Sequence, residues 1–176
     1  MKPRASSEPA TPTLFRPGQN CASVVRSDRI GLLVDGAEYF TAFAEAAEQA
    51  RESILILSWD FDSRTVLSFG PDGKEIVTLG DFLNRLVRRR PGLHVNILIW
   101  DYPVVYGFDR EFPPIYGLGW KVARRIHLHY DDMIPLGACH HQKVVVIDDR
   151  VAFAGGLDLP SRRWDTCQHE SEDPRR

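Results

Sequence analysis

The chain has 176 residues, of which 43% are hydrophobic and 26% are charged, and its formal net charge is −2. This composition is typical of a globular domain with one core, and it lacks the basic excess of a protein that binds nucleic acid non-specifically. Three widely spaced cysteines form no CxxC pair, so neither a zinc site nor a disulfide framework is indicated.

The first 20 residues, MKPRASSEPATPTLFRPGQN, are rich in proline, serine and threonine. Because they contain no apolar core segment, they do not form a Sec signal peptide. We interpret residues 1–20 as a flexible arm and residues 21–176 as one folded domain. No stretch of the sequence reaches the roughly 18 apolar residues of a membrane-spanning helix. We therefore expect a protein that is cytoplasmic or peripheral at a membrane, with secretion by another route left open.

Apolar runs and helical patterns alternate along the rest of the chain. The expected strands are residues 29–36, 53–61, 94–102, 125–132, 142–149 and 151–159. The expected helices are residues 37–51 and 77–92, and residues 103–125 are interpreted as a loop with a short helix. A tight turn near residues 148–150 makes the last two strands a hairpin. This alternation predicts an α/β fold, with a mixed or parallel sheet flanked by helices.

Two of the expected strands end in the same short pattern, I-L-x-W-D-aromatic, at residues 56–61 and 97–102. The pattern places Asp60 and Asp101 at the carboxyl ends of strands, where ligands usually bind to α/β sheets. The alternative is that these aspartates begin turns, while the adjacent tryptophans fill the edge of the sheet.

The stretch HHQKVVVIDD places reactive side chains at the start of an apolar strand. Side chains alternate along a strand, so His141 and Lys143 share one face, ~6.5 Å apart, a distance that suits two groups gripping one phosphate. Asp148 falls on the other face, where it is placed to hold the turn or a neighbouring basic group.

A glycine pair follows in the next apolar stretch. Gly155 and Gly156 leave the chain without side chains, so that a ligand or another backbone can come close. Asp158 can point toward the same space, and Asp165 lies further along. A histidine that attacks through one ring nitrogen needs an acceptor for its other N–H, which Asp158 or Asp165 could provide.

The spacing His141-x-Lys143-x4-Asp148, followed by Gly155-Gly156-x-Asp158, resembles the HxKxxxxD motif of the phospholipase D superfamily. The stretches LFRPGQN, LVDGAEYF, WDFDSR and GGLDL..RRWDT extend the resemblance, to bacterial phospholipase D-like proteins, over most of residues 14–175. The resemblance implies one lobe of a phospholipase D-like fold, with the motif on a strand hairpin near the carboxyl terminus.

The resemblance also implies a chemistry. One histidine attacks phosphorus and forms a phosphohistidine, a second histidine protonates the leaving alcohol, and water or another alcohol resolves the intermediate. No metal and no cofactor are needed. His141 is the implied nucleophile, although the roles of the two histidines could be exchanged. Lys143 would hold phosphate oxygens and Asp148 would be mainly structural, while Gly155, Gly156, Asp158 and Asp165 would bind phosphate or support the site.

The implied substrates are glycerophospholipids, met transiently at a membrane surface, with no nucleic acid expected as a partner. Two enzymatic alternatives remain, a cardiolipin synthase-like phosphatidyl transferase and a nuclease of the same superfamily. A third alternative is a lobe that binds phosphate head groups but is inactive alone.

Sites of this family combine two HxKxxxxD motifs that face one another, whereas this sequence contains one. Its other lysines, Lys2, Lys74 and Lys121, have no histidine two residues before them. We therefore expect the amino-terminal half of a longer enzyme, or a homodimer, that is nearly inactive without a second lobe.

A competing metal site is indicated by His127-x-His129-x-Asp131, because two histidines on one strand face can bind zinc. The third histidine that such a pattern needs is replaced by Asp132. His140 points away from His141 along the expected strand and is assigned to a loop or packing role.

Overall fold

The structure is a computed structural model, and it describes residues 14–70, 75–100, 120–133, 135, 138–173 and 175. Asp101, Tyr102 and most of the loop expected at residues 103–125 lie outside the described residues. Contacts divide the chain into two units, Met1–Leu32 and Leu33–Arg176. In the first unit, a β-bridge joins Pro17 to Cys21. The domain boundary expected after residue 20 stays a prediction.

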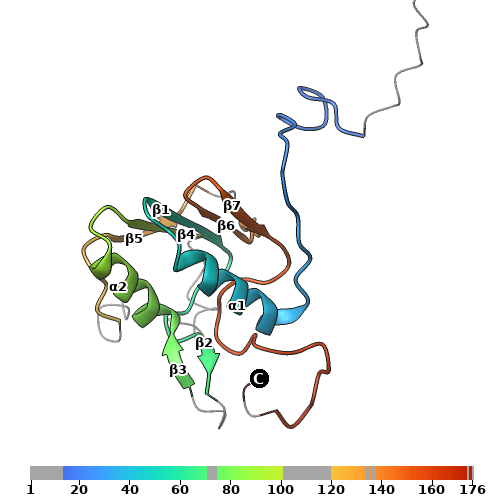
Figure 1. Cartoon of the computed structure of the whole chain (residues 1–176). Helices are drawn as coiled ribbons and strands as arrows, with labels where there is room; N and C mark the ends of the chain where they lie inside the picture. The colour runs from blue at the N-terminus through green and yellow to red at the C-terminus, as the bar shows by residue number, and fades with distance from the viewer. Residues whose placement is uncertain are drawn as a thin grey trace, which may run out of the picture. The chain divides into compact units, whose positions relative to one another are not determined.

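Helices and strands alternate in the second unit, and both helices lie on the same side of the main sheet (Figure 1). The elements are α1 (Asp35–Ala47), β1 (Ser53–Ser58), β2 (Val66–Phe69), β3 (Glu75–Thr78), α2 (Leu79–Arg89), β4 (His94–Trp100), β5 (Ile126–Asp131), β6 (Val144–Ile147) and β7 (Val151–Ala154). No helix among the described residues is long and apolar enough to cross a membrane.

The main sheet is mixed, with the strand order β5-β4-β1-β6-β7. Strand β4 runs parallel to both β1 and β5, whereas β6 runs antiparallel to β1 and β7 runs antiparallel to β6. The predicted α/β fold with a mixed sheet is confirmed. Because β6 runs against β1, its first residue, Val144, pairs with Leu57 near the end of β1.

The hairpin of β6 and β7 closes through three residues, 148–150, because Ile147 pairs with Val151. Asp148 and Asp149 have φ values of 50° and 51°, and the Arg150 N–H donates to the Ile147 carbonyl at 3.0 Å. Positive φ at both positions is left-handed backbone, which aspartate tolerates better than most residues. The predicted hairpin is confirmed.

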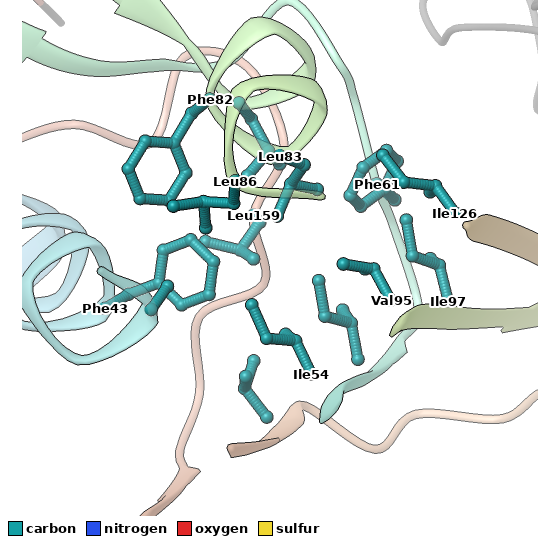
Figure 2. Packing of buried hydrophobic residues seen from close by; sticks show 14 of the residues in the cluster. Phe43, Ile54, Phe61, Phe82, Leu83, Leu86, Val95, Ile97, Ile126 and Leu159 are labelled. Carbon is teal, nitrogen blue, oxygen red and sulfur yellow. The ribbon is translucent and has the colours of Figure 1, made fainter. Parts of the chain in front are cut away.

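The core lies between the helices and one face of the sheet, where alternate strand residues are buried. Helix residues point toward strand residues across this layer (Figure 2). The labelled members of the cluster are Phe43, Ile54, Phe61, Phe82, Leu83, Leu86, Val95, Ile97, Ile126 and Leu159. This burial fixes the register of the strands, because a shift of one residue would expose the apolar face.

The beginning of α1 lies against the segment that follows β7. The Ala37 N–H donates to the Asp165 carbonyl at 2.9 Å. A Cβ atom at Gly36 would lie 2.0 Å from the Arg163 carbonyl oxygen, so this close approach requires glycine. Residues 163–165 are therefore held at the amino end of α1.

Several expected bounds were wrong: the strand expected at residues 151–159, for example, ends at Ala154 and leaves Gly155 and Gly156 outside it. The strand expected at residues 29–36 is not formed: residues 29–34 join no strand of the described part of the chain, and α1 begins at Asp35. Ile30 and Leu32 are 94% and 92% exposed, which shows that an apolar pattern makes no strand without a neighbour to pair with. The helix expected from residue 77 begins at Leu79, because Val77 and Thr78 belong to β3.

Candidate active site

The residues of the HxKxxxxD motif lie at the two ends of β6. Lys143 immediately precedes the strand, next to the pair of Val144 with Leu57 near the end of β1. Asp148 comes directly after the strand. His141 is exposed, whereas only 8% of the Lys143 side chain is exposed. The Lys143 Nζ lies 3.4 Å from the His141 carbonyl oxygen, so the lysine side chain folds toward the backbone two residues before it.

The ammonium of Lys143 forms an ion pair with Asp158, at 3.3 Å between Nζ and Oδ2. The Asp158 side chain is 4% exposed, and its Oδ1 accepts hydrogen bonds from the Ser58 hydroxyl at 2.9 Å and the Trp59 N–H at 3.2 Å. A buried charge is tolerated when it is paired and its remaining acceptor sites are hydrogen-bonded. Asp158 therefore connects Lys143 to the end of β1.

Tyr39 of α1 lies close to this ion pair. Burial, and to a lesser extent the negative charge of Asp158, raises the pKa of Tyr39 above its ordinary value. The phenol therefore stays neutral at physiological pH, and it adds no second negative charge beside Lys143. Its ring packs edge-on against Phe153 of β7, with 5.8 Å between the ring centroids.

Two tryptophans form the aromatic side of the site. The Trp59 ring lies 5.8 Å from the His141 ring at 65°, and the Lys143 Nζ lies 5.8 Å from the Trp59 ring centroid. Trp100 stacks against Trp59 at 6.0 Å and 22°, and its Nε1–H donates to the Trp59 carbonyl at 3.0 Å. The repeated W-D pattern is the sequence signal for these tryptophans, which only the alternative interpretation assigned to the edge of the sheet.

Asp148 lies at the far end of β6, where it joins the start of β1. Its carboxylate accepts hydrogen bonds from the N–H groups of Arg51 at 2.7 Å, Glu52 at 2.9 Å and Ser53 at 2.8 Å. Burial by itself would raise the pKa of Asp148, but the hydrogen bonds from these three N–H groups outweigh it and lower the pKa. Asp148 thus holds the backbone that enters β1.

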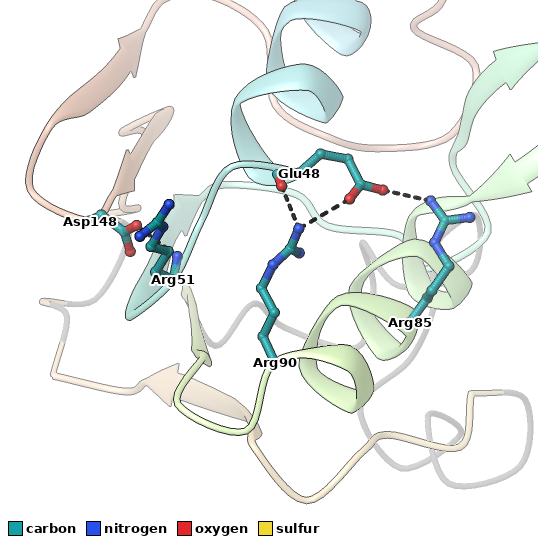
Figure 3. Close-up of polar contacts among 5 residues, drawn as sticks. All are labelled: Glu48, Arg51, Arg85, Arg90 and Asp148. Carbon is teal, nitrogen blue, oxygen red and sulfur yellow. Dashed lines mark hydrogen bonds and ion pairs between the residues drawn. The ribbon is translucent and has the colours of Figure 1, made fainter.

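The chain just before this anchor is held to the second helix (Figure 3). Glu48 follows α1, and its carboxylate pairs with Arg85 at 3.1 Å and with Arg90 at 3.4 Å. Figure 3 places Asp148 beside Arg51, a few residues further along the same connection. The connection from α1 to β1 is therefore fixed by two sets of polar contacts.

Gly155 and Gly156 follow β7 and are exposed. Apart from each glycine and its two chain neighbours, no heavy atom of the described residues lies within 4 Å of the position that a Cβ would take at either glycine. The Gly155 N–H donates to the Lys143 carbonyl at 3.3 Å, which places the glycine pair beside the start of β6. This open space is compatible with the predicted approach of a phosphate, and that role stays a prediction.

Asp165 contacts another histidine. Its Oδ2 lies 2.9 Å from the His169 Nδ1, and its Oδ1 accepts the Thr166 N–H at 2.8 Å. The His169 Nε2 lies 3.8 Å from an Asp35 oxygen. These contacts fasten the end of the described chain to the start of α1. Which carboxylate orients His141 stays a prediction.

The histidines of the alternative metal site lie side by side on one face of the sheet. The rings of His127 and His129 are 6.4 Å apart, and His94 stacks on His127 at 6.0 Å and 7°. Asp131 lies 3.4 Å from the Nε2 of His140. Within the described residues, no group of three or more histidine, cysteine, aspartate or glutamate side chains is placed to hold a metal ion.

Comparison with known proteins yields one group of relatives. The chain is 32% identical over 143 residues to phospholipase D C of Dictyostelium discoideum, 31% over 145 residues to phospholipase D2 of Bos taurus, and 30% over 154 residues to phospholipase D1 of Homo sapiens. These matches cover 75–80% of this chain but only 8–15% of the relatives, so the chain spans a small part of their length. No family model matches.

Among solved structures, the chain is similar to NucT from Helicobacter pylori, with a TM-score of 0.43 and 16% identity over 70% of this chain and 71% of that one. The sequence relatives and the motif at the start of β6 agree. The chain belongs to the phospholipase D superfamily.

Proposed function

We propose that this chain is a catalytic lobe of a phospholipase D-type phosphodiesterase that acts on glycerophospholipids through a phosphohistidine intermediate. One observation carries the proposal: an exposed His141 lies beside a lysine ammonium that is fixed by a buried carboxylate. An exposed imidazole can reach a phosphorus atom, and a fixed cation can stabilise the charge that develops on the phosphoryl oxygens.

In the first step, an unprotonated nitrogen of His141 attacks phosphorus. The nitrogen–phosphorus bond forms while the bond from phosphorus to the leaving alcohol oxygen breaks, and a general acid protonates that oxygen. Water then attacks phosphorus and loses a proton to the same group, now a base, and the nitrogen–phosphorus bond breaks to release the monoester. An alcohol in place of water gives transphosphatidylation.

We assign the general acid to a second lobe, which also supplies positive charge. Lys143 is paired with Asp158 at 3.3 Å, so this lysine and its partner together carry no net charge. A phosphodiester carries one negative charge, and in the transition state more negative charge develops on its non-bridging oxygens. The second lobe belongs either to a longer chain or to a second copy, and a dimer would bring two His141 side chains together near a two-fold axis.

We further propose that the substrate is met at a membrane surface, by a protein that is cytoplasmic or peripheral. The names of the relatives support a lipid substrate. The net charge of −2 gives no support to general attraction of nucleic acid.

The test combines a size measurement with an assay. Light scattering after gel filtration gives the oligomeric state, and hydrolysis of phosphatidylcholine vesicles is followed with the wild type and with His141→Asn. His127→Asn is the matched control, because His127 is likewise an exposed histidine but lies in β5, outside the proposed site. We expect activity in the dimer, or after a second lobe is added, and its loss in His141→Asn alone.

Each other outcome has a separate meaning. Robust hydrolysis by a verified monomer would contradict the second-lobe assignment. A dimer or reconstituted pair without hydrolysis that depends on His141 would contradict the proposed activity. Cleavage of DNA that depends on His141, in a parallel assay, would identify the nuclease alternative.

A further inference from the structure

We propose that Trp59 is a positioning residue, whose ring holds the His141 imidazole and the Lys143 ammonium in one arrangement. This inference rests on the proposed function, because it concerns how the same site is organised. The ring centroids of Trp59 and His141 are 5.8 Å apart, and the Lys143 Nζ is 5.8 Å from the Trp59 centroid. One indole therefore contacts the two side chains to which the chemistry is assigned.

The indole is itself fixed through its backbone. The Trp59 N–H donates to Asp158, and its carbonyl accepts the Nε1–H of Trp100. Asp158 also pairs with the Lys143 ammonium. The cation therefore contacts both the Asp158 carboxylate and the ring of Trp59, the residue whose backbone N–H donates to that carboxylate. A lysine side chain has many rotamers, and two fixed contacts reduce the number that it populates.

Packing alone does not account for Trp59. Trp100, at the end of β4, is 7% exposed, whereas Trp59 is half-buried and packs against the core cluster. The Trp59 ring also lies next to an exposed histidine and an ammonium, a position in which an aromatic face attracts a cation.

The test uses signals that exist without turnover. The sequence contains four lysines and six histidines, so selective labelling gives few NMR signals, and His141→Asn assigns the relevant histidine. The variants are Trp59→Leu, which removes the aromatic ring, and Trp59→Phe, which keeps one. Trp164→Leu is the control, because Trp164 contacts Phe69 and Arg175. Dimethyl phosphate, a small phosphodiester, is titrated into each protein.

We expect Trp59→Leu to move the His141 ring signal and the Lys143 side-chain signal together, toward their positions in a free side chain. The affinity for dimethyl phosphate should fall about tenfold, because a lost cation–π contact near a partly desolvated ammonium is of that order. Trp59→Phe should restore most of both effects, and Trp164→Leu should cause neither.

The proposal is overturned if Trp59→Leu leaves both signals unchanged, or if Trp59→Phe behaves like Trp59→Leu. If Trp59→Leu does not fold, Lys143→Met in the otherwise wild-type chain provides the reciprocal test. The indole N–H signal of Trp59 should then move, and an unmoved signal would overturn the proposal. Signals that respond as expected, while neither the single lobe nor the paired lobes bind dimethyl phosphate, would support the role of Trp59 and contradict the proposed function.

Discussion

The residue that follows β6, Asp148, accepts several hydrogen bonds, whereas the residues that precede β6, His141 and Lys143, form fewer polar contacts. At its end, the carboxylate of Asp148 accepts three backbone N–H groups and ties β6 to the entry of β1. Before its start, His141 is exposed, and the Lys143 ammonium contacts one carboxylate, the His141 carbonyl oxygen and one aromatic ring. The two ends belong to one sequence motif, yet they differ in how completely their polar groups are satisfied.

This difference teaches that the motif combines two separate tasks. Polar groups that are fully hydrogen-bonded stabilise a fold, whereas reactive groups must keep a face open for a substrate. A change at the exposed His141 should therefore reduce activity with little effect on stability, whereas a change at the buried Lys143 should affect both. Changes after β6 should reduce stability with little effect on the chemistry of the molecules that remain folded.

The largest effect is expected for His141→Asn. Loss of the nucleophile removes the covalent path, which is typically worth several orders of magnitude in rate. Because His141 is exposed, the free energy of unfolding should stay close to that of the wild type. Hydrolysis of a phosphodiester by the paired lobes and urea unfolding give the two values. Near wild-type turnover in a folded variant would refute the assignment of His141.

Lys143→Met tests whether the two tasks separate completely. Most activity should be lost, and stability should fall as well, by about 3 kcal/mol, because Asp158 is left as a buried charge without its cation. Adding Asp158→Asn should recover much of that stability without recovering activity. Unfolding curves of the two single variants and the double variant measure this coupling, and strictly additive losses would contradict the ion pair.

Asp148→Ala should act on stability alone. Three hydrogen bonds to a charged acceptor are lost at a partly exposed site, so we expect a loss of about 1–2 kcal/mol in the free energy of unfolding. Asp148→Asn is the matched control, since asparagine tolerates the positive φ and keeps one acceptor oxygen. It should lose less stability than the alanine variant. Activity per folded molecule should be unchanged in both, and a large loss in either would assign Asp148 to the chemistry.

The smallest effect is expected from pH. The pKa of Asp148 is lowered in the folded protein, so its contribution to stability is present above the unfolded-state pKa of about 3.9 and is lost as pH falls through the folded-state value. Asp62 has a pKa lowered by Arg64 against the effect of burial, and it adds a loss of the same sign. The difference in unfolding free energy between the wild type and Asp148→Asn, measured from pH 6 down to acid, isolates Asp148. A difference that does not shrink in acid would contradict this role.

The fold could be predicted from the sequence where apolar periodicity decides the outcome. The strands that contain Ile54 and Ile97 were predicted from apolar runs in the sequence, and the structure buries their alternate residues. The pair β2 and β3 was missed, although Pro71, Asp72 and Gly73 stand between VLSF and EIVT and are a common turn signal. Short strands outside the main sheet carry little periodicity, so turn residues were the available signal.

The site was harder to predict from the sequence than the fold, because its contacts depend on strand direction. His141 and Lys143 could be placed on one face, but nothing local shows that β6 runs antiparallel to β1. That direction brings Lys143 to Trp59 and to Asp158. Spacing along the chain predicted the identity of the motif, whereas only the pairing of strands shows which aromatic and acidic side chains surround it.

The antiparallel pairing of β1 and β6 also has a consequence for the order in which the lobe is made. The hydrogen bond from Ser58 to Asp158 spans 100 residues of sequence, and the bonds to Asp148 span 95–97. At a translation rate of about 5–20 residues per second, β1 has to wait about 5–20 s on the ribosome before Asp158 has been synthesised. Contacts this distant in sequence also form slowly in the released chain, because a long loop must close first. The candidate active site is therefore among the last parts of the lobe to assemble.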